Sequence, residues 1–426
     1  MHHLNRWTLS FVIGFLLLVA SNGASQPSAA ERIDAYITPF AKAGHFAGVV
    51  LVAQEGKPIY EKAFGYANVE KRALNTIDSR IGVASITKPM TAVITRRLVE
   101  AGKLSLSDKV SKFIPGFPLG EKIDVGMLYR HRSGIPHRVM PPEMETLPYT
   151  AAEMVERARL AKLEFQPDSG YLYSSAGYSV LARILEIASG KPYGELLKQY
   201  VFTPAGMTNS IDHPPGGNIP SFAEDHLLGA EGAYVAPKKD YSFLVGAGSV
   251  VSTARDIHSF GLALVSGAFG DSVRAGYLRN RRWWANGSTN GHRAEVRVNG
   301  EHNYSYALVS NLNSGASDMI LQAIQDIMEG KQISAPVVPR AKVTVRPASE
   351  YPQYFGTFER EGGSRFEVRA KQDTLLAGEV PLIPTGADCF FEYKYYGEVC
   401  FVRDAERRII HITWASPGFT STWVKK

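Results

Sequence analysis

Ser85 and Lys88 stand three residues apart in the stretch Gly82-Val83-Ala84-Ser85-Ile86-Thr87-Lys88-Pro89-Met90, and together they can perform nucleophilic chemistry. A serine hydroxyl attacks a carbonyl poorly until a neighbour accepts its proton. A lysine amine can do so when burial lowers its pKa. The same pattern, a serine and a lysine three residues apart, also occurs where a helix N-cap serine is followed by a surface lysine. The pair is therefore a candidate nucleophile and base that needs support from the rest of the chain.

The residues after Ser85 predict the helix that positions this pair. Between Thr87 and Ala101 the apolar side chains recur at helical spacing, at Met90, Val93, Ile94 and Leu98. Gly102 closes the run. Ser85 therefore lies at or beside a helix N-terminus, where backbone N–H groups and the positive dipole end favour developing negative charge. Lys88, one turn later, projects on the same face.

Strand patterns occur near both ends of the first 330 residues. After an amphipathic helix over 30–43, runs 48–53 and 58–64 predict a hairpin, and runs 294–298 and 304–309 predict a second one around Asn299-Gly300, followed by a helix over 316–329. Residues from about 104 to 245 show mainly helical periodicity. We expect an α/β fold with one antiparallel sheet flanked by helices and an inserted all-helical domain, with a cleft between the lobes.

The rest of the chain suggests further divisions. Residues 333–350 contain three prolines and predict a linker, and residues 351–426 alternate short β-rich runs with turns, which predicts a small β-barrel. The serine hydrolase domain is expected at 30–332, with its helical insertion at about 104–245. At the N-terminus, 1–25 reads as a cleavable export signal because basic residues precede a short apolar run and small residues, and an uncleaved anchor is the alternative. We expect a periplasmic or secreted protein with no stable membrane span after cleavage.

Composition, the cysteines and the absence of certain motifs limit the binding partners, disulfides and cofactors that we expect. Among 426 residues, 45% are hydrophobic and 21% are charged, and a formal net charge of +6 without a lysine or arginine block predicts no nucleic-acid partner. The two cysteines, Cys389 and Cys400, flank a turn-like stretch. Either a disulfide across a hairpin or two unpaired buried thiols fits this pattern. The histidines show no metal-ligand spacing and no dinucleotide-binding motif is present, so we expect no metal and no cofactor.

Several segments accompany Ser85 in a fixed order. They are Ser85-Ile86-Thr87-Lys88, 102–108, 128–136, Tyr173-Ser174-Ser175, 189–192, 204–207 and 248–256. In this order they resemble the superfamily of serine β-lactamases and penicillin-binding proteins, which includes class C β-lactamases, D-Ala-D-Ala carboxypeptidases, D-aminopeptidases and family VIII carboxylesterases. Residues 354–426 resemble the lipocalin-like β-domain that follows some of these hydrolases.

The resemblance implies an acyl-enzyme mechanism. Ser85 would attack a carbonyl while Lys88 and Tyr173 manage protons, because the hydroxyl proton must leave as the tetrahedral intermediate forms and must return to the leaving group. A nearby ammonium favours phenolate and burial favours a neutral amine, so either Lys88 or Tyr173 can be the base.

The third motif departs from the family pattern of a lysine or histidine, any residue, and glycine. The best match is Ala285-Asn286-Gly287, in which Ala285 replaces the cation. Gly287 allows close backbone approach, and the N–H of Ser288 would join that of Ser85 as an oxyanion hole. A competing register, His292-Arg293-Ala294, keeps a histidine but loses the glycine.

Substitutions in these motifs bear on the substrate. Alanine at 285 cannot hold a carboxylate, and Ser175 stands where an asparagine commonly binds the substrate amide. Trp284, with Trp283, either forms an apolar wall of the cleft or belongs to the core. Arg293 would restore a positive charge in the cleft, and a substrate carboxylate bound there is the alternative to a neutral substrate.

We expect an exported serine hydrolase acting on small-molecule esters or amides with an esterase-like preference. The first alternative is a D-Ala-D-Ala carboxypeptidase, D-aminopeptidase or β-lactamase, acting on D-amino-acid peptides or antibiotics. The second is a catalytically silent binding protein.

Overall fold

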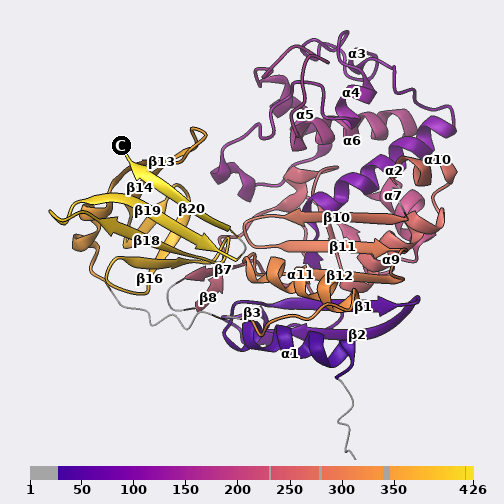
Figure 1. Cartoon of the computed structure of the whole chain (residues 1–426). Coiled ribbons are helices and arrows are strands. Elements are labelled where there is room, and N and C mark those ends of the chain that lie inside the picture. The colour runs from indigo at the N-terminus through magenta and orange to yellow at the C-terminus, as the bar shows by residue number, and fades with distance from the viewer. Residues whose placement is uncertain (1–26, 230–231, 278–280, 337, 339–345, 418) are drawn as a thin grey trace, which may run out of the picture.

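The central feature of the molecule, seen in a computed structural model, is a five-stranded antiparallel sheet in the order β10-β11-β12-β1-β2 (Figure 1). The structure describes residues 27–229, 232–277, 281–336, 338, 346–417 and 419–426. The sheet strands are β1 (Gly48–Gln54), β2 (Lys57–Phe64), β10 (Arg282–Ser288), β11 (Arg293–Asn299) and β12 (Tyr304–Ser310). β1 pairs with β12 along its whole length, so strands from both ends of this region share one sheet, as expected.

Each face of this sheet has its own hydrophobic core. Val49 and Leu51 of β1 pack with the helices α2 and α9, whereas Val50 and Val52 pack with α1 and α11. This division follows from the strand period of two. Because β1 is covered on both faces, Gly48–Ala53 is a continuous buried run rather than an alternating one. The covering helices are α1 (Ala29–Lys42), α2 (Thr87–Glu100), α9 (Ala254–Ser266) and α11 (Ala316–Met328).

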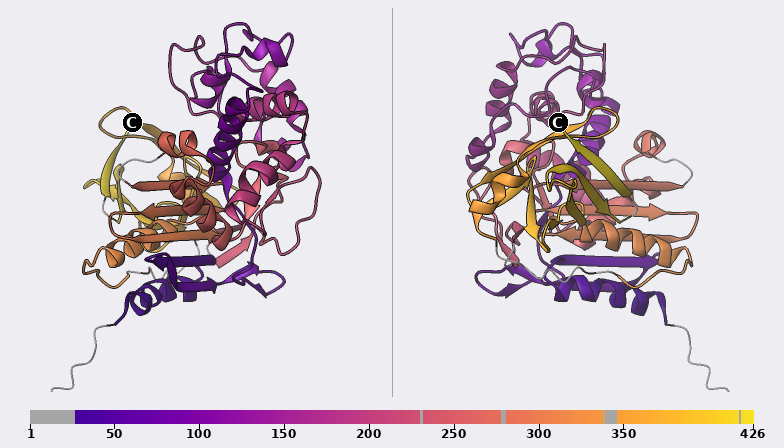
Figure 2. Two further views of the ribbon diagram at one scale, coloured as in Figure 1. Left: turned by 90° about the vertical axis from the view of Figure 1, so that its right-hand side faces the viewer. Right: turned by 60° about the vertical axis from the view of Figure 1, so that its left-hand side comes forward.

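A mainly helical lobe lies beyond the edge strand β10 (Figures 1 and 2). Its helices are α3 (Val110–Phe113), α4 (Val125–Tyr129), α5 (Ala151–Arg159), α6 (Ser175–Ser189), α7 (Tyr193–Leu197) and α8 (Thr203–Ala205). The segment expected to be wholly helical also holds three short strands, β6 (Ile211–Asp212), β7 (His226–Gly229) and β8 (Gly232–Val235). Strands of two to four residues are too short to show a periodic signal in sequence.

Smaller elements connect these parts. β6 joins β5 (Ile81–Gly82) and β9 (Val250–Ser252) in a three-stranded sheet, and β7 pairs with β8. β3 (Tyr66–Asn68) pairs with β4 (Ala73–Leu74), and α10 (Asp271–Tyr277) precedes β10. None of the described helices combines the length and the apolar character that a bilayer crossing needs. The expected signal, 1–25, lies outside the described residues.

The C-terminal region is a closed eight-stranded barrel, which confirms the predicted β-barrel. Its strands are β13 (Gly356–Glu359), β14 (Arg365–Lys371), β15 (Thr374–Ala377), β16 (Val380–Pro384), β17 (Cys389–Glu392), β18 (Gly397–Arg403), β19 (Ile409–Ser416) and β20 (Phe419–Lys425). The barrel packs on the sheet region, where Tyr396 Oη lies 2.7 Å from His45 Nδ1 and the N–H of Gly315 donates to Tyr393 O. Within the expected linker, 337 and 339–345 lie outside the described residues.

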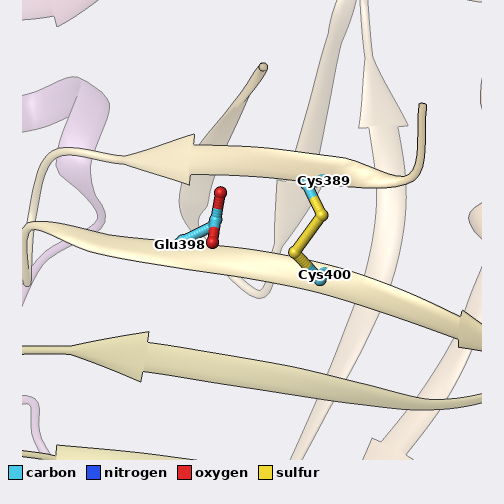
Figure 3. A group of neighbouring side chains, drawn as sticks. All are labelled: Cys389, Glu398 and Cys400. Carbon is cyan, nitrogen blue, oxygen red and sulfur yellow. A yellow bond between two sulfur atoms is a disulfide. The ribbon is translucent and has the colours of Figure 1, made fainter. Parts of the chain in front are cut away.

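Cys389 and Cys400 form a disulfide, the first of the two pairings considered. They are register partners on β17 and β18, with an S–S distance of 2.08 Å and a Cα–Cα distance of 4.1 Å (Figure 3). The carboxylate of Glu398 lies beside the two sulfur atoms. Because the sulfurs are bonded to each other, they offer no thiolate, and this group is not a metal-ligand set.

Candidate active site

Ser85 lies in a 3-10 turn, Ala84–Ile86, that leads directly into α2. Ala84 has φ +46°, a left-handed conformation that costs a non-glycine residue about 1–2 kcal/mol. Gly287 of β10 presses against this turn, since a Cβ at Gly287 would lie 2.7 Å from Ser85 N and 2.2 Å from Val83 O. Only glycine therefore permits this approach, which brings the edge strand alongside the backbone of Ser85.

Lys88 projects from the first turn of α2 into the lobe interface. Its Nζ lies 3.3 Å from Ser85 Oγ and donates to Ser175 Oγ at 3.2 Å and to Ala247 O at 2.9 Å. The side chain is 5% exposed, and no ion pair between described residues includes it. Burial without a carboxylate lowers the pKa of Lys88 to about 7, so a neutral amine is accessible near neutral pH.

Tyr173 precedes α6 and reaches the same oxygen. Its hydroxyl donates to Ser85 Oγ at 2.8 Å, and Lys88 Nζ lies 4.6 Å from the centre of its ring. Burial raises the pKa of Tyr173, so the phenol keeps its proton over the range in which Lys88 titrates. Ser174 caps α6 by accepting from Gly177 N, which holds the chain turn that presents Tyr173.

Two histidines flank the Tyr173 ring, His131 at 4.6 Å and His137 at 5.5 Å between ring centres. Their Nδ1 atoms accept from the backbone N–H groups of Ser174 and Ser175, which leaves the proton of each neutral ring on Nε2. Burial, reinforced by the charge of Lys88, lowers both pKa values, that of His131 to about 4. Both rings are therefore neutral near pH 7.

A cleft of about 1000 Å³ joins these groups to β10. β10 is the edge strand of the sheet and lies below the helical lobe in Figure 1. Its lining includes Ser85, Lys88, Tyr173, both histidines and the residues 282–288. This volume is that of a small-molecule binding site. The structure thus brings the predicted nucleophile, amine and phenol together with Ala285, Asn286, Gly287 and Ser288.

The two tryptophans of β10 lie on opposite faces of the sheet. Trp283 is 5% exposed and packs its ring edge-on against Phe260, so it belongs mainly to the core. Trp284 is 54% exposed and lines the cleft. Alternation along the strand then places Ala285 and Gly287 on the face of Trp283, directed toward the Ser85 turn.

Two residues, Arg293 and His292, lie outside the cleft lining, and a third, Ser175, lies beside Lys88. Arg293 is absent from the cleft lining and pairs instead with Asp318 at 2.6 Å and Glu295 at 3.3 Å. His292, the histidine of the competing register, is fully buried with Nε2 2.5 Å from Asp225 Oδ1. Ser175 is 8% exposed and contacts Lys88, and it lines a smaller adjoining cavity of about 100 Å³. The predicted cleft cation at 293 is therefore a structural ion pair.

Arg297 lines the cleft but was not singled out from the sequence. It pairs in register with Trp284, and this alignment depends on the turn that joins β10 to β11. The sequence did not predict that His131 and His137 lie beside Tyr173. His131 belongs to the motif segment 128–136, and this was the sequence feature that could have indicated a place in the site.

Comparisons with known proteins show the family of the chain. The family model described as "Beta-lactamase" matches residues 33–327. The chain belongs to the β-lactamase family. The match ends before the barrel, whose first strand begins at Gly356. The family comprises serine hydrolases related to penicillin-binding proteins.

Relatives cover different shares of the chain. Penicillin-binding protein 4* of Bacillus subtilis is 27% identical over 86% of this chain and 92% of its own length. The Bacillus subtilis protein PbpX is 30% identical over 54% of this chain, and the chain spans only 58% of PbpX. Among solved structures, D-amino acid amidase from Ochrobactrum anthropi SV3 has a TM-score of 0.63 at 21% identity, covering 71% of this chain and 99% of that one. At this identity the likeness shows the fold alone.

Proposed function

We propose that this protein hydrolyses small-molecule esters or amides through an acyl-enzyme on Ser85. One observation carries the proposal: Ser85 Oγ lies 3.3 Å from an amine and 2.8 Å from a phenol at the floor of a cleft. A hydroxyl with two such neighbours can lose its proton to one and leave the other to protonate the departing group.

Lys88 is the better base of the two. Its lowered pKa supplies a neutral amine, whereas the raised pKa of Tyr173 keeps the phenol protonated. In acylation, Ser85 Oγ bonds to the substrate carbonyl carbon and its proton passes to Lys88. The bond from that carbon to the leaving oxygen or nitrogen then breaks, and Tyr173 supports return of the proton to the leaving alcohol or amine. In deacylation, a water oxygen bonds to the acyl carbon and gives a proton to Lys88, the bond from that carbon to Ser85 Oγ breaks, and the proton returns to Ser85 Oγ as the carboxylic acid leaves.

The N–H groups of Ser85 and Ser288 are proposed to hold the oxyanion. The close approach of Gly287 to the Ser85 turn supports this role, since it carries Ser288 alongside the nucleophile. Donors that point at developing charge typically contribute about 10²–10³ in rate.

The cleft favours esters over substrates with a carboxylate beside the scissile bond. Ala285 provides no cation where the family pattern has one, and Arg293 is engaged with Asp318 and Glu295. The exposed ring of Trp284 offers apolar surface to an acyl chain. A neutral group is thus expected next to the reacting carbonyl.

The test offers purified full-length protein a short-chain nitrophenyl ester, a chromogenic cephalosporin and a D-Ala-D-Ala peptide. We expect turnover of the ester, its loss in Ser85→Ala, and a decrease of about 10²–10⁴ in kcat for Tyr173→Phe. Ser107→Ala and Tyr171→Phe are matched controls outside the cleft lining and should keep wild-type rates. Preferential turnover of the peptide or cephalosporin would establish the alternative hydrolases, and no turnover of any substrate would favour a binding protein.

We also propose that the protein works outside the cytoplasm. The Cys389–Cys400 disulfide supports this location, because such bonds persist mainly in oxidising compartments. Thiol labelling of protein recovered from its native host should find both cysteines blocked until reduction. Free thiols in freshly isolated protein would contradict the proposal.

A further inference from the structure

His131 follows helix α4 in a conformation that usually belongs to glycine. Its N–H donates to Leu128 O at 3.2 Å, and the N–H of Arg132 donates to Met127 O at 2.8 Å. These two bonds form a Schellman motif, in which a residue just past the helix takes a left-handed conformation and is usually glycine. His131 occupies that position with φ +57°. Because glycine would avoid the strain of a side chain there, a histidine in this place points to a use for its side chain.

The segment that His131 contacts has no regular secondary structure of its own. Residues 171–174 belong to neither a helix nor a strand, and α6 begins at Ser175. The N–H of Leu172 donates to His131 O at 3.0 Å, and the N–H of Ser174 donates to His131 Nδ1 at 3.1 Å. One histidine therefore binds the backbone immediately before and immediately after Tyr173.

The imidazole ring of His131 also supports the ring of Tyr173. The two ring centres are 4.6 Å apart, and the imidazole is stacked on Tyr178 with 4.9 Å between ring centres. Tyr178 is a fixed support, since it lies within α6, is buried, and donates its hydroxyl to Tyr129 O at 3.1 Å. Tyr173, by contrast, is 37% exposed and lines the cleft. Its phenol therefore depends on packing from its buried side to stay directed at Ser85 Oγ.

His137, the other histidine beside Tyr173, makes different contacts. Its Nδ1 accepts from Ser175 N at 3.3 Å, and its carbonyl oxygen accepts from Ala176 N at 3.4 Å. Both bonds go to the first turn of α6, where backbone N–H groups have no partner within the helix. His137 thus caps the helix, whereas His131 holds the irregular segment that carries the phenol.

We propose that His131 is a positioning residue for Tyr173, whose phenol it holds against Ser85 Oγ through two backbone hydrogen bonds and a ring contact. This inference rests on the proposed function and adds to it a residue that acts through the phenol rather than on the substrate. A misplacement of about 1 Å in a reacting group can lower a rate about 100-fold, so the contribution of His131 belongs in kcat and not in KM.

The experiment measures kcat and KM for a short-chain nitrophenyl ester. Alanine removes both the acceptor and the ring, so His131→Ala should lower kcat about 10- to 100-fold and change KM less than about twofold. Asparagine tolerates a left-handed backbone and offers a side-chain oxygen as acceptor, so His131→Asn should recover about threefold or more of the lost kcat.

His258→Ala is the matched control. His258 is also buried, has Nε2 2.7 Å from Ser305 Oγ, and lies outside the cleft lining. Its loss should lower the urea concentration at the unfolding midpoint and leave kcat unchanged. The same urea unfolding checks that the His131 variants are folded.

Tyr173→Phe separates positioning from a merely structural role. If His131 acts through the phenol, adding His131→Ala to Tyr173→Phe should lower kcat by less than about twofold, because the positioned hydroxyl is already gone. An equal loss in both backgrounds, a loss confined to KM, or no recovery in His131→Asn would overturn the inference.

A second measurement does not depend on turnover, and it separates this inference from the proposed function. Crystal structures of wild type and His131→Ala would compare the place of the Tyr173 hydroxyl. In the variant it should move from Ser85 Oγ by about 1 Å or more, or occupy several positions, and this supports the inference even if no ester is hydrolysed. A Tyr173 hydroxyl that stays in its wild-type place would refute the inference.

Discussion

Lys88 and His292 are two buried basic side chains that lie close to the same short segment, yet their surroundings differ in one respect. Lys88 is 5% exposed and has only neutral partners, namely two hydroxyls and a carbonyl. His292 is fully buried and has Asp225 Oδ1 at 2.5 Å, with Tyr241 donating to the other carboxylate oxygen. The Lys88 amine lines the cleft, whereas the His292 imidazole does not.

This difference separates a reactive group from a structural one. An ammonium buried without a counter-charge is destabilised, so its pKa falls toward the value that proton transfer at neutral pH requires. Burial by itself would raise the pKa of Asp225, but the adjacent His292 and the hydrogen bond from Tyr241 bring it below the usual value. The carboxylate therefore stays ionised and fixes the imidazole in place.

The β10–β11 hairpin also fixes the backbone on which Ser85 depends. A Cβ at Gly82 would lie 2.4 Å from His292 Nδ1, and one at Gly287 would lie 2.7 Å from Ser85 N. The β10–β11 hairpin thus touches the segment before Ser85 at two points, one held by the Asp225–His292 pair and one by Gly287.

Removing the amine of Lys88 should have the largest effect. We expect Lys88→Met to lower kcat/KM for a nitrophenyl ester by about 10³-fold or more, because Ser85 then lacks its proton acceptor. The variant should fold, since methionine fills the buried volume without a charge, and circular dichroism with thermal melting would check this. Lys103→Met, at an exposed lysine, is the control. Retention of more than a tenth of wild-type activity in a folded Lys88→Met would remove Lys88 from the mechanism.

The pH dependence should follow Lys88 rather than the histidines. With a pKa of about 7, the fraction of neutral amine falls about tenfold per unit below pH 7, so log kcat/KM should rise with unit slope to about pH 7 and then level off. The pKa of His131, about 4, would place the rise much lower. A profile flat between pH 5 and 8 would contradict the assignment.

The same titration has a consequence for stability. Between about pH 7 and 10.5, the ordinary pKa of a lysine, the unfolded chain binds the Lys88 proton and the folded chain does not, so this group makes the free energy of unfolding rise with pH across that window. The stability of wild type relative to Lys88→Met, followed by urea unfolding, should therefore improve from pH 7 to pH 10. A difference independent of pH would show that burial does not perturb the amine.

Sequence alone could locate part of this arrangement. Ser85, Lys88 and Tyr173 occur in an ordered set of motifs, and the helical spacing after Ser85 fixes the side on which Lys88 projects. The sheet could be predicted because its strands are long and apolar. The position of Arg297 could not, because it follows from the register between β10 and β11 and from the face of the strand on which Trp284 lies.

His292 shows the same limit from another side. A histidine beside a turn is typical of a solvent-exposed hairpin edge. In the structure the His292 ring is buried against Asp225, which comes from a segment 67 residues earlier. Arg293 likewise finds Asp318 on α11, which packs over the sheet only once the whole chain has folded. Such pairings depend on tertiary contacts that local patterns do not encode.

Neutralising Asp225 should have the smallest effect on turnover and a measurable one on stability. In Asp225→Asn, Tyr241 and His292 lose their ionised partner, and we expect a loss of about 1–3 kcal/mol in the free energy of unfolding. The hairpin turn is also held by hydrogen bonds between Thr289 and the backbone of His292, so Ser288 should shift little and kcat/KM should fall only a few-fold.

The matched control is Asp318→Asn, which removes an exposed carboxylate that pairs with Arg293 and should cost less than about 1 kcal/mol. Urea unfolding at pH 7 compares the two variants. If Asp225→Asn instead abolished turnover while leaving stability unchanged, the buried pair would belong to the proton-transfer machinery, and the distinction between Lys88 and His292 would fail.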